Sequence, residues 1–327
     1  MSRHVRVKIF PGDDRVTDLA GSDMREAPPW LRAVGVLLRG LPRGRYPLMN
    51  RMARWGAGHA FAAEFPFEGR RIRFWCDLRN SLAREVFFLG RYEPQETLLL
   101  PALLRPGDTC VDVGAHWGYF SLLAAARVGR TGRVLAVEAD PRVFATLEKT
   151  LSLNPGLSVE AMQVAAADEP GTIVLNGFDE RGDNWGISSI ATSQGGERFE
   201  VRAEPLDAIL ERCGVAEVGL LKMDIEGAEV LALRGAERAL RERRIRTMVL
   251  ELHPPQIAAL GARVSDVITQ LRASEYHLWA VDHSLETTRA AAYGRVREPT
   301  ALLKPFEASS LGSWPHLVAS RERDPFA

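Results

Sequence analysis

The pattern of apolar and polar positions changes near residue 108. Before that point the apolar residues follow no sustained period, apart from short strand-like runs at 5–9 and, after a turn at Gly69, at 72–74. We therefore expect residues 1–85 to form a largely irregular N-terminal extension that covers the rest of the molecule.

From residue 108 onward, apolar runs of strand length alternate with segments of helical spacing. The pattern predicts strands at 109–113, 133–138, 158–164, 218–224, 247–252, 276–281 and 314–319, and helices at 119–128, 141–153, 228–240 and 264–273. The runs VDV, VLAVE and MVLEL are almost continuously apolar, as in parallel strands covered on both faces. This alternation predicts an α/β domain over residues 86–327, built on a doubly wound, mostly parallel seven-stranded sheet.

Two further strand-like runs, at 171–175 and 198–203, interrupt this rhythm and predict an inserted β-hairpin. The polar, glycine-rich segment between them is long for a compact domain, and such loops are commonly functional. We expect it to overhang the carboxyl ends of the strands, where Trp185, Ser188 and Ser189 would shape a substrate pocket. A hairpin tip without a function is the alternative.

Ligands of doubly wound sheets bind beyond the carboxyl ends of the strands, which directs attention to the residues that follow each strand. The first strand of this sheet runs into DVGAHWGY (112–119). Gly114 allows a sharp turn and a close approach of a ligand, and Gly118 opens the next helix, where free N–H groups favour a negative group. The spacing is neither GxGxxG nor a P-loop, so it suits the carboxylate of an amino acid better than a triphosphate.

Two acidic residues follow the next strands. Glu138 ends the second strand, 24 residues after Gly114, where a carboxylate can accept hydrogen bonds from both hydroxyls of a ribose. Asp168 follows the third strand and can accept a hydrogen bond from an adenine amino group, although it can equally be a turn residue. The glycine turn and Glu138 together predict a nucleoside-containing ligand.

Charged residues also end the fourth and fifth strands, in KMDIEG and ELH. Charges rarely end a buried parallel strand without a role, because their desolvation is costly unless they are paired. We predict that Asp224 and His253 form a base dyad in which the carboxylate orients the imidazole, with Glu226 as a further catalytic residue. A structural network among Lys222, Asp224 and Glu226 is one alternative, and a divalent cation held by Asp224, Glu226 and His253 is another that we do not favour.

Charge and composition mainly exclude classes of function. Lys+Arg and Asp+Glu both number 42, so the formal net charge is zero and nucleic acid is not an expected partner. The three cysteines lie far apart, which excludes a disulfide framework and a cysteine zinc site. Neither a signal peptide nor a membrane span is apparent, and we expect a cytoplasmic protein.

One stretch departs from this neutral balance. Residues 30–55 contain six arginines and no acidic residue. We expect helices broken by Pro42 and Pro47 whose arginines face solvent; a surface for a membrane or an acidic partner is the alternative.

Several of these motifs resemble the FkbM-type S-adenosylmethionine-dependent methyltransferase family. The resemblance lies in DVGAHWGY (112–119), VEADP (137–141) and KMDIEGAE (222–229), and GRYEP, the Leu206-Asp207 pair and ELH also fit. It covers roughly residues 86–281 and extends to the last strand. His116 and Trp117 depart from the family, which more often has Asn and a smaller aliphatic residue at these positions.

The resemblance implies a Rossmann-like class I methyltransferase fold, S-adenosyl-L-methionine as cofactor, and methylation of a hydroxyl on a small metabolite, sugar or natural product. A nicotinamide-dependent oxidoreductase is an alternative, although His116 occupies the position of a required glycine; a non-catalytic nucleoside-binding module is another. The expected cofactor-binding residues are Glu93, Asp112, Gly114, His116, Gly118, Glu138, Ala139 and Asp168.

Overall fold

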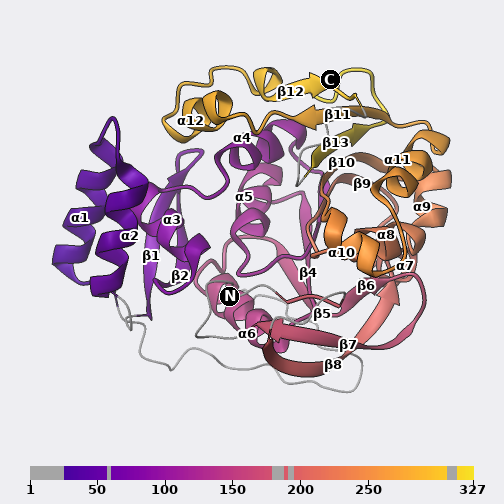
Figure 1. The fold of residues 1–327 in the computed structure, drawn as a ribbon, viewed down its shortest axis with the longest axis horizontal. Coiled ribbons are helices and arrows are strands. Elements are labelled where there is room, and N and C mark those ends of the chain that lie inside the picture. The colour runs from indigo at the N-terminus through magenta and orange to yellow at the C-terminus, as the bar shows by residue number, and fades with distance from the viewer. Residues whose placement is uncertain (1–25, 57–59, 179–187, 191–194, 308–314) are drawn as a thin grey trace.

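The computed structural model describes residues 26–56, 60–178, 188–190, 195–307 and 315–327, and an eight-stranded sheet lies at its centre (Figure 1). The strands are β3 Thr109–Val113, β4 Arg133–Glu138, β5 Val159–Gln163, β9 Val218–Met223, β10 Ile245–Glu251, β11 His277–Val281, β12 Leu303–Pro305 and β13 His316–Ser320. Their spatial order is β12-β11-β13-β10-β9-β3-β4-β5. Neighbours from β5 to β10 are parallel, whereas β13 is antiparallel to β10 and β11, and β12 is antiparallel to β11.

The predicted doubly wound α/β class is confirmed, with one strand more than expected. The additional strand, β12, has three residues (LKP) at the sheet edge, too few for a period to show in the sequence. The chain order reverses between β3 and β9, because β4 and β5 extend the sheet on one side and β9 and β10 on the other. The carboxyl ends of β3 and β9 therefore flank the switch point at which such folds bind ligands.

Helices cover both faces of the sheet. Successive side chains of a strand point to opposite faces, so Cys110 and Val134 belong to one apolar cluster while Val111 and Leu135 belong to the other. This burial on both faces explains the continuous apolar runs. The first face carries α4 Pro94–Leu103, α5 Tyr119–Val128, α6 Pro141–Ser152 and α12 Leu285–Ala292, and the second carries α7 Leu206–Arg212, α8 Glu229–Arg234, α9 Glu237–Arg241, α10 Pro254–Ala259 and α11 Val264–Ala273 (Figure 1).

The prediction of one helix over 228–240 is wrong, because the segment folds as α8 and α9 with a break at Gly235. A Cβ at Gly235 would lie 2.0 Å from the carbonyl oxygen of Ala167, and the Gly235 carbonyl accepts a hydrogen bond from the Asp207 N–H at 2.8 Å. The backbone at Gly235 therefore packs directly against the segments that contain Ala167 and Asp207, and the helix is interrupted there.

The expectation of an irregular N-terminal region, made for residues 1–85, is also wrong for 26–56 and 60–85, the part of that region that the structure describes. Its elements are α1 Pro29–Gly40, α2 Arg45–Gly56, β1 Ala60–Phe67, β2 Arg70–Asp77 and α3 Ser81–Leu89. β1 and β2 form an antiparallel hairpin whose turn residues Glu68 and Gly69 have positive φ, as tight hairpin turns require. The predicted run at 72–74 lies in β2, whereas the run at 5–9 lies outside the described residues. β1 buries three consecutive residues, 61–63, and therefore lacks the alternation that identifies a strand.

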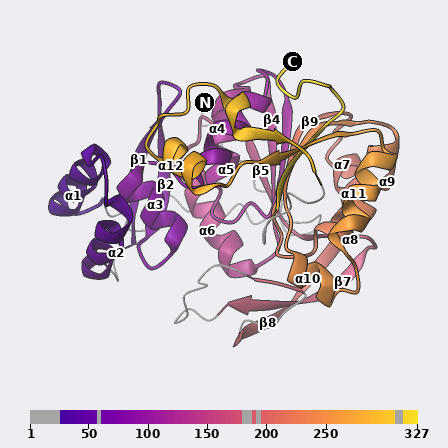
Figure 2. The ribbon, with the colours of Figure 1, turned by 45° about the horizontal axis from the view of Figure 1, so that its top comes forward.

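This N-terminal unit packs against the first face of the sheet domain (Figure 2). The ring of Phe65 lies 5.5 Å from that of Tyr119, and the ring of Phe74 lies 6.5 Å from that of Trp117. One apolar cluster includes side chains from both parts, and α3 spans residue 85.

The arginine-rich stretch 30–55 forms α1 and α2, and only some of its arginines face solvent. Arg39 donates a hydrogen bond to the Phe87 carbonyl and Arg45 donates one to the Leu41 carbonyl, both at 2.6 Å. The expectation of solvent-facing arginines is therefore wrong for these two: Arg39 joins α1 to α3, and Arg45 joins the start of α2 to the segment that follows α1. Among the arginines of this stretch whose exposure the structure describes, Arg32, Arg43 and Arg51 are exposed. Among the described residues, every helix is too short or too polar to cross a lipid bilayer.

The predicted hairpin insertion is confirmed. β7 Gly171–Phe178 pairs with β8 Gly195–Pro205 in antiparallel fashion, and β6 Ala165–Ala167 joins β8 in parallel. In the polar loop, Ser189 exchanges backbone hydrogen bonds with Asn176 at 2.9 and 3.0 Å. This pairing places Ser189 at the carboxyl end of β9, where its hydroxyl donates to the Glu226 carbonyl at 3.0 Å.

Candidate functional site

A cavity of about 270 Å³ opens at the carboxyl ends of β3, β4 and β9. It lies at the switch point of the sheet, where this fold class binds ligands. The predicted site residues that line it are Glu93, Gly114, His116, Glu138, Ala139, Ser188, Asp224 and Glu226.

The turn after β3 lines the cavity between the end of β4 and the end of β9. Gly114 has a φ of 78°, and a Cβ there would lie 1.8 Å from the Asp224 carbonyl oxygen. The N–H groups of Gly114 and Ala115 both donate to the Val137 carbonyl, at 2.9 and 3.0 Å. The glycine is therefore required because three strand ends meet at this turn.

Two residues predicted to bind the cofactor lie behind the turn and do not line the cavity. Asp112 is buried and accepts a hydrogen bond from the Ser121 hydroxyl at 2.6 Å. A Cβ at Gly118 would lie 2.6 Å from a methyl group of Leu147, so this glycine allows α5 to pack closely on α6. In this structure both residues stabilise the turn from the side that faces away from the cavity.

Glu138 lies at the carboxyl end of β4 and faces the cavity. Its two carboxylate oxygens accept hydrogen bonds from the backbone N–H groups of His116 and Asp140, each at 2.9 Å. Burial raises the pKa of Glu138 to about 7, although these N–H donors favour the charged form. A carboxylate held in this way has lone pairs left for further hydroxyl donors.

Of the remaining predicted binding residues that the structure describes, only Ser188 lines the cavity. Asp168 is exposed and does not line the cavity, and Trp185 lies outside the described residues. Ser188 lines the cavity and donates to an Asp140 carboxylate oxygen at 2.6 Å. Ser189 is buried, and its hydroxyl braces the loop after β9.

Four carboxylates face the side of the cavity opposite Glu138: Glu93, Asp224, Glu226 and Glu251, here called the acidic wall. Glu93 and Glu226 have positive φ values of 39° and 52°, which are uncommon for residues other than glycine. Such strained positions cluster at functional sites, where the surrounding structure holds them.

Lys222 stabilises the acidic wall from within the protein. Its Nζ lies 3.5 Å from Asp224, 3.7 Å from Asp112 and 3.3 Å from the Gly114 carbonyl oxygen. Burial opposes the charge of Lys222, but Asp224 and Asp112 outweigh it and raise the pKa of the amine. The lysine is thus a fixed positive charge between the two sides of the cavity.

Two members of the acidic wall, Asp224 and Glu93, have pKa values shifted in opposite directions. Burial would raise the pKa of Asp224, but the positive charges of Lys222 and His253 outweigh burial and lower it. Burial and the carboxylates of Glu96, Glu251 and Asp224 raise the pKa of Glu93 well above its usual range. Neighbouring carboxylates whose pKa values shift in opposite directions suit different proton roles, with Asp224 favoured as an acceptor and Glu93 as a donor.

His253 lies directly behind the acidic wall. Its Nε2 is 3.8 Å from Asp224, 3.7 Å from Glu226 and 3.7 Å from Glu251. Its Nδ1 lies 2.9 Å from Glu229, a fully buried carboxylate. Burial lowers the pKa of His253, but the hydrogen bond and charge of Glu229 outweigh burial and raise it to about 9.

The predicted dyad therefore needs one correction, since Glu229 and not Asp224 orients the imidazole. Asp224 lies beyond hydrogen-bond distance from His253, whereas Glu229 reaches Nδ1 from the first turn of α8. Glu229 also accepts the backbone N–H groups of Ile225 and Gly227, at 3.2 and 3.1 Å. It thus fixes both the loop after β9 and the imidazole.

The alternative of a cation held by Asp224, Glu226 and His253 is geometrically permitted, because these side chains offer ligand atoms within 4.8 Å of one another. Burial raises the pKa of Glu226 to about 7, although the neighbouring His253 favours its charged form. A carboxyl group with such a pKa exchanges protons readily near neutrality, so proton transfer is an equally direct use of this group.

Sequence reasoning assigned no catalytic or binding role to Glu229 or Glu251. Glu251 could have been identified, because the period of two along β10 and beyond it places it on the same side as His253. The contact of Glu229 with His253 gives no such signal, since the two residues meet only when α8 packs beside the end of β10.

Comparison with known proteins agrees with this geometry. Residues 112–278 match the family model described as the methyltransferase FkbM domain. The methyltransferase sdnD of Sordaria araneosa is 30% identical over 213 residues, which cover 55% of this chain and 80% of that protein. The 31-O-demethyl-FK506 methyltransferase FkbM of Streptomyces tacrolimicus is 31% identical over 190 residues, covering 50% of this chain and 71% of that protein. The chain thus belongs to the FkbM methyltransferase domain family and is a methyltransferase whose cofactor is S-adenosyl-L-methionine.

Proposed function

We propose that the protein transfers a methyl group from S-adenosylmethionine to a hydroxyl group of a small molecule. The observation that carries this proposal is that one cavity contains Glu138 on one side and the acidic wall, backed by His253, on the other. We call the first the cofactor side and the second the acceptor side.

The residues of the cofactor side fit the cofactor. Glu138 uses one lone pair of each oxygen for a backbone N–H, which leaves acceptors for the two ribose hydroxyls. Apolar side chains, among them Val164, Ala166 and Leu175, line the cavity and suit a flat adenine ring. The acidic wall complements the positive sulfonium and amino groups of the ligand.

The acceptor side fits the proton chemistry of a hydroxyl acceptor. The sulfonium of the bound cofactor supplies a methyl group that is already activated for displacement. Asp224 is ionised and accepts a hydrogen bond from the acceptor hydroxyl, which orients the oxygen. Asp224 takes the hydroxyl proton as the new C–O bond forms and passes it to Nε2 of the neutral form of His253, which lies behind it and is held by Glu229 through Nδ1.

An oxygen acceptor is also the chemistry described by the name of one relative, the 31-O-demethyl-FK506 methyltransferase, which is 31% identical to this chain. A wall of carboxylates suits an uncharged, hydroxylated molecule and disfavours phosphate groups, because like charges repel. We therefore propose a small hydroxylated metabolite, sugar or natural product as the acceptor.

The test is a methyl-transfer assay with panels of hydroxylated small molecules, in which S-adenosylhomocysteine release is measured and the product is identified by NMR. We expect a methoxy product, together with S-adenosylhomocysteine binding and no NAD(H) binding in calorimetry. A product methylated at nitrogen or carbon would refute the proposed acceptor chemistry. Cofactor binding without turnover on any hydroxylated panel would favour a non-catalytic module.

A further inference from the structure

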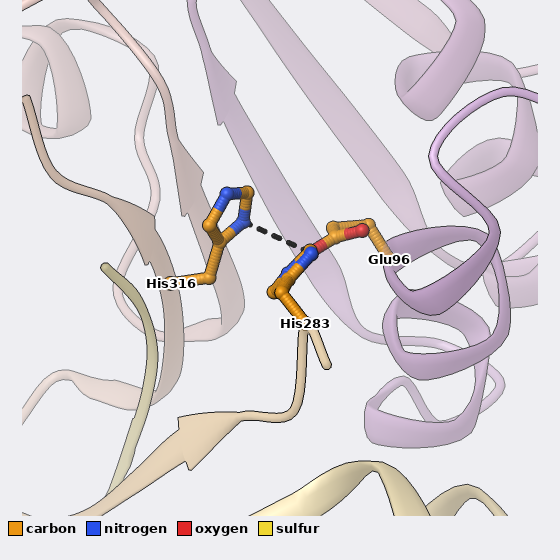
Figure 3. A group of neighbouring side chains, drawn as sticks. All are labelled: Glu96, His283 and His316. Carbon is orange, nitrogen blue, oxygen red and sulfur yellow. Dashed lines mark hydrogen bonds and ion pairs between the residues drawn. The ribbon is translucent and has the colours of Figure 1, made fainter. Parts of the chain in front are cut away.

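A second group of side chains with metal-ligating atoms lies next to the acidic wall but outside the cavity. Glu96, His283 and His316, here called the Glu96 cluster, each offer one ligand atom, and these atoms lie within 4.8 Å of one another. Figure 3 shows both imidazole rings turned toward the carboxylate of Glu96. We infer that the Glu96 cluster binds a divalent transition-metal ion, with Zn²⁺ the best match to its ligands.

The ligand set and its spacing suit such an ion. One Glu96 oxygen, Oε1, lies 2.9 Å from His283 Nε2 and 2.9 Å from His316 Nδ1. Two imidazoles and one carboxylate form a set that binds Zn²⁺ and related first-row ions. A tetrahedral ion with bonds of about 2.0–2.1 Å separates its ligand atoms by about 3.3 Å, so each imidazole nitrogen needs to move away from Oε1 by only a few tenths of an ångström.

A buried, unsatisfied oxygen is the second observation that points to an ion. Glu96 is 3% exposed, and its Oε2 has no hydrogen-bond partner among the described residues. An unpaired carboxylate oxygen in the protein interior is costly. Hydrogen bonds from the two histidines satisfy Oε1 alone, whereas a dication beside the carboxylate stabilises both oxygens.

The scaffold holds the ligands in place. His316 on β13 lies directly opposite Glu251 on β10, and its Nε2 is 3.4 Å from Glu251. A carboxylate behind a ligating imidazole is the usual arrangement at metal sites, because it fixes the tautomer and the ring orientation. His283 lies in the turn between Asp282 and α12, where Asp282 accepts hydrogen bonds from the Ser284 N–H at 2.9 Å and the Thr287 hydroxyl at 2.7 Å.

The position of the cluster indicates a positioning role. The side chain of His283 is 35% exposed, which provides an entry path and room for water as a fourth ligand. The ion would join the first turn of α4, which follows Glu93, to β13, which pairs with the strand of Glu251. It would therefore fix two members of the acidic wall without contacting the substrate. The inference does not depend on which molecule accepts the methyl group.

The test uses the full chain without an affinity tag, stripped with EDTA and then titrated with Zn²⁺ alone or Co²⁺ alone. Calorimetry gives the stoichiometry, and the visible d–d bands of Co²⁺ report on its ligand geometry. The informative variant is His283→Ala, because this side chain is partly exposed and its loss should not unfold the protein. Its matched control is His277→Ala, which removes an exposed histidine of β11 outside the cluster.

We expect one ion per chain, an affinity lower by at least about 100-fold in His283→Ala, and no change in His277→Ala. Zn²⁺ should raise the melting temperature of the unsubstituted chain and leave that of His283→Ala unchanged. Failure of the stripped chain to bind Zn²⁺ would overturn the inference. So would equal binding by His283→Ala, or loss of the ion in His253→Ala with retention in His283→Ala, which would place the ion in the cavity.

Discussion

The two sides of the cavity hold their carboxylates by different means. On the cofactor side, Glu138 is held by two backbone N–H groups of the adjoining loops. On the acceptor side, four carboxylates surround Lys222 and His253, and the charges are balanced through side chains. The first arrangement is set by the course of the backbone, whereas the second is a network of coupled charges.

This difference governs how each side should respond to substitution. A carboxylate held by backbone donors can be changed without altering its neighbours, so the effect should stay local. In the acceptor-side network, removal of one charge changes the electrostatic environment of all the others, because buried charges interact strongly and are costly when unpaired. The cofactor side should therefore show separable effects on binding, and the acceptor side should show effects on turnover and its pH dependence.

The largest effect should come from Gly114→Ala, because the two sides meet at this residue. A Cβ there would lie 1.8 Å from the Asp224 carbonyl oxygen, and the φ of 78° already disfavours other residues. We expect loss of both cofactor binding and turnover, and a free energy of unfolding lower by at least about 2 kcal/mol. Denaturant unfolding and calorimetry with S-adenosylhomocysteine measure these changes.

The matched control is Gly261→Ala, which has a similar φ of 74° and open space where its Cβ would lie. It incurs the backbone cost alone, so its destabilisation should be smaller and its cofactor affinity normal. Equal destabilisation in the two variants would show that the close approach of Gly114 to the Asp224 carbonyl adds nothing to the backbone cost, which would contradict the prediction.

Asp224→Asn should have the next largest effect, confined to turnover. The substitution keeps the shape of the side chain but removes the ionised acceptor for the hydroxyl. We expect kcat to fall by about 10²–10⁴-fold while the affinity for S-adenosylhomocysteine changes by only a few-fold. Glu217→Gln, an exposed change just before β9, is the control and should leave both quantities unchanged. Equal losses of turnover and cofactor affinity would indicate a folding role for Asp224.

The same contrast explains which parts of the molecule the sequence could predict. The cofactor side is largely local, since a glycine after β3 and a carboxylate at the end of β4 can be recognised from strand ends and spacing. The acceptor side depends on contacts between distant segments, such as Glu229 with His253 and Glu251 with His316. The antiparallel entry of β13 beside β10 creates the second of these contacts, and no local pattern encodes it.

The errors in the fold have equally physical causes. α8 and α9 are apolar at helical spacing, and only the close approach of Gly235 to Ala167 interrupts them. β1 lacks alternation because packing against α3 and the sheet domain buries consecutive residues. The spacing of apolar residues thus shows neither a close approach of two backbones, as at Gly235, nor the burial that tertiary packing adds along β1.

Glu138→Gln should have a smaller effect, confined to cofactor binding. Glutamine preserves the shape but removes the charge that accepts the ribose hydroxyls, and a hydrogen bond to a charged group is worth about 1.5–3 kcal/mol. We expect the affinity for S-adenosylhomocysteine to fall by about 10–100-fold, with kcat at saturating cofactor nearly unchanged. Normal affinity, relative to the Glu217→Gln control, would remove Glu138 from the cofactor site.

The smallest effect should come from Glu229→Gln, as a shift in pH dependence. If neutral His253 accepts the proton, kcat/KM should rise with pH through the pKa of about 9 that Glu229 sustains. Glutamine can still accept the N–H groups of Ile225 and Gly227, but it lacks the charge that stabilises the imidazolium. The pKa of His253 should then fall and the rising limb should move to lower pH, while kcat/KM of the variant and of the unsubstituted enzyme stay within a few-fold of each other on the alkaline plateau.

The control is Glu237→Gln, an exposed change on α9, which should leave the limb in place. A limb that stays near pH 9 in Glu229→Gln would separate Glu229 from the imidazole. A limb near pH 7 in the unsubstituted enzyme that persists in Glu138→Gln would identify Glu226 as the base, because Glu138 and Glu226 both have a pKa of about 7.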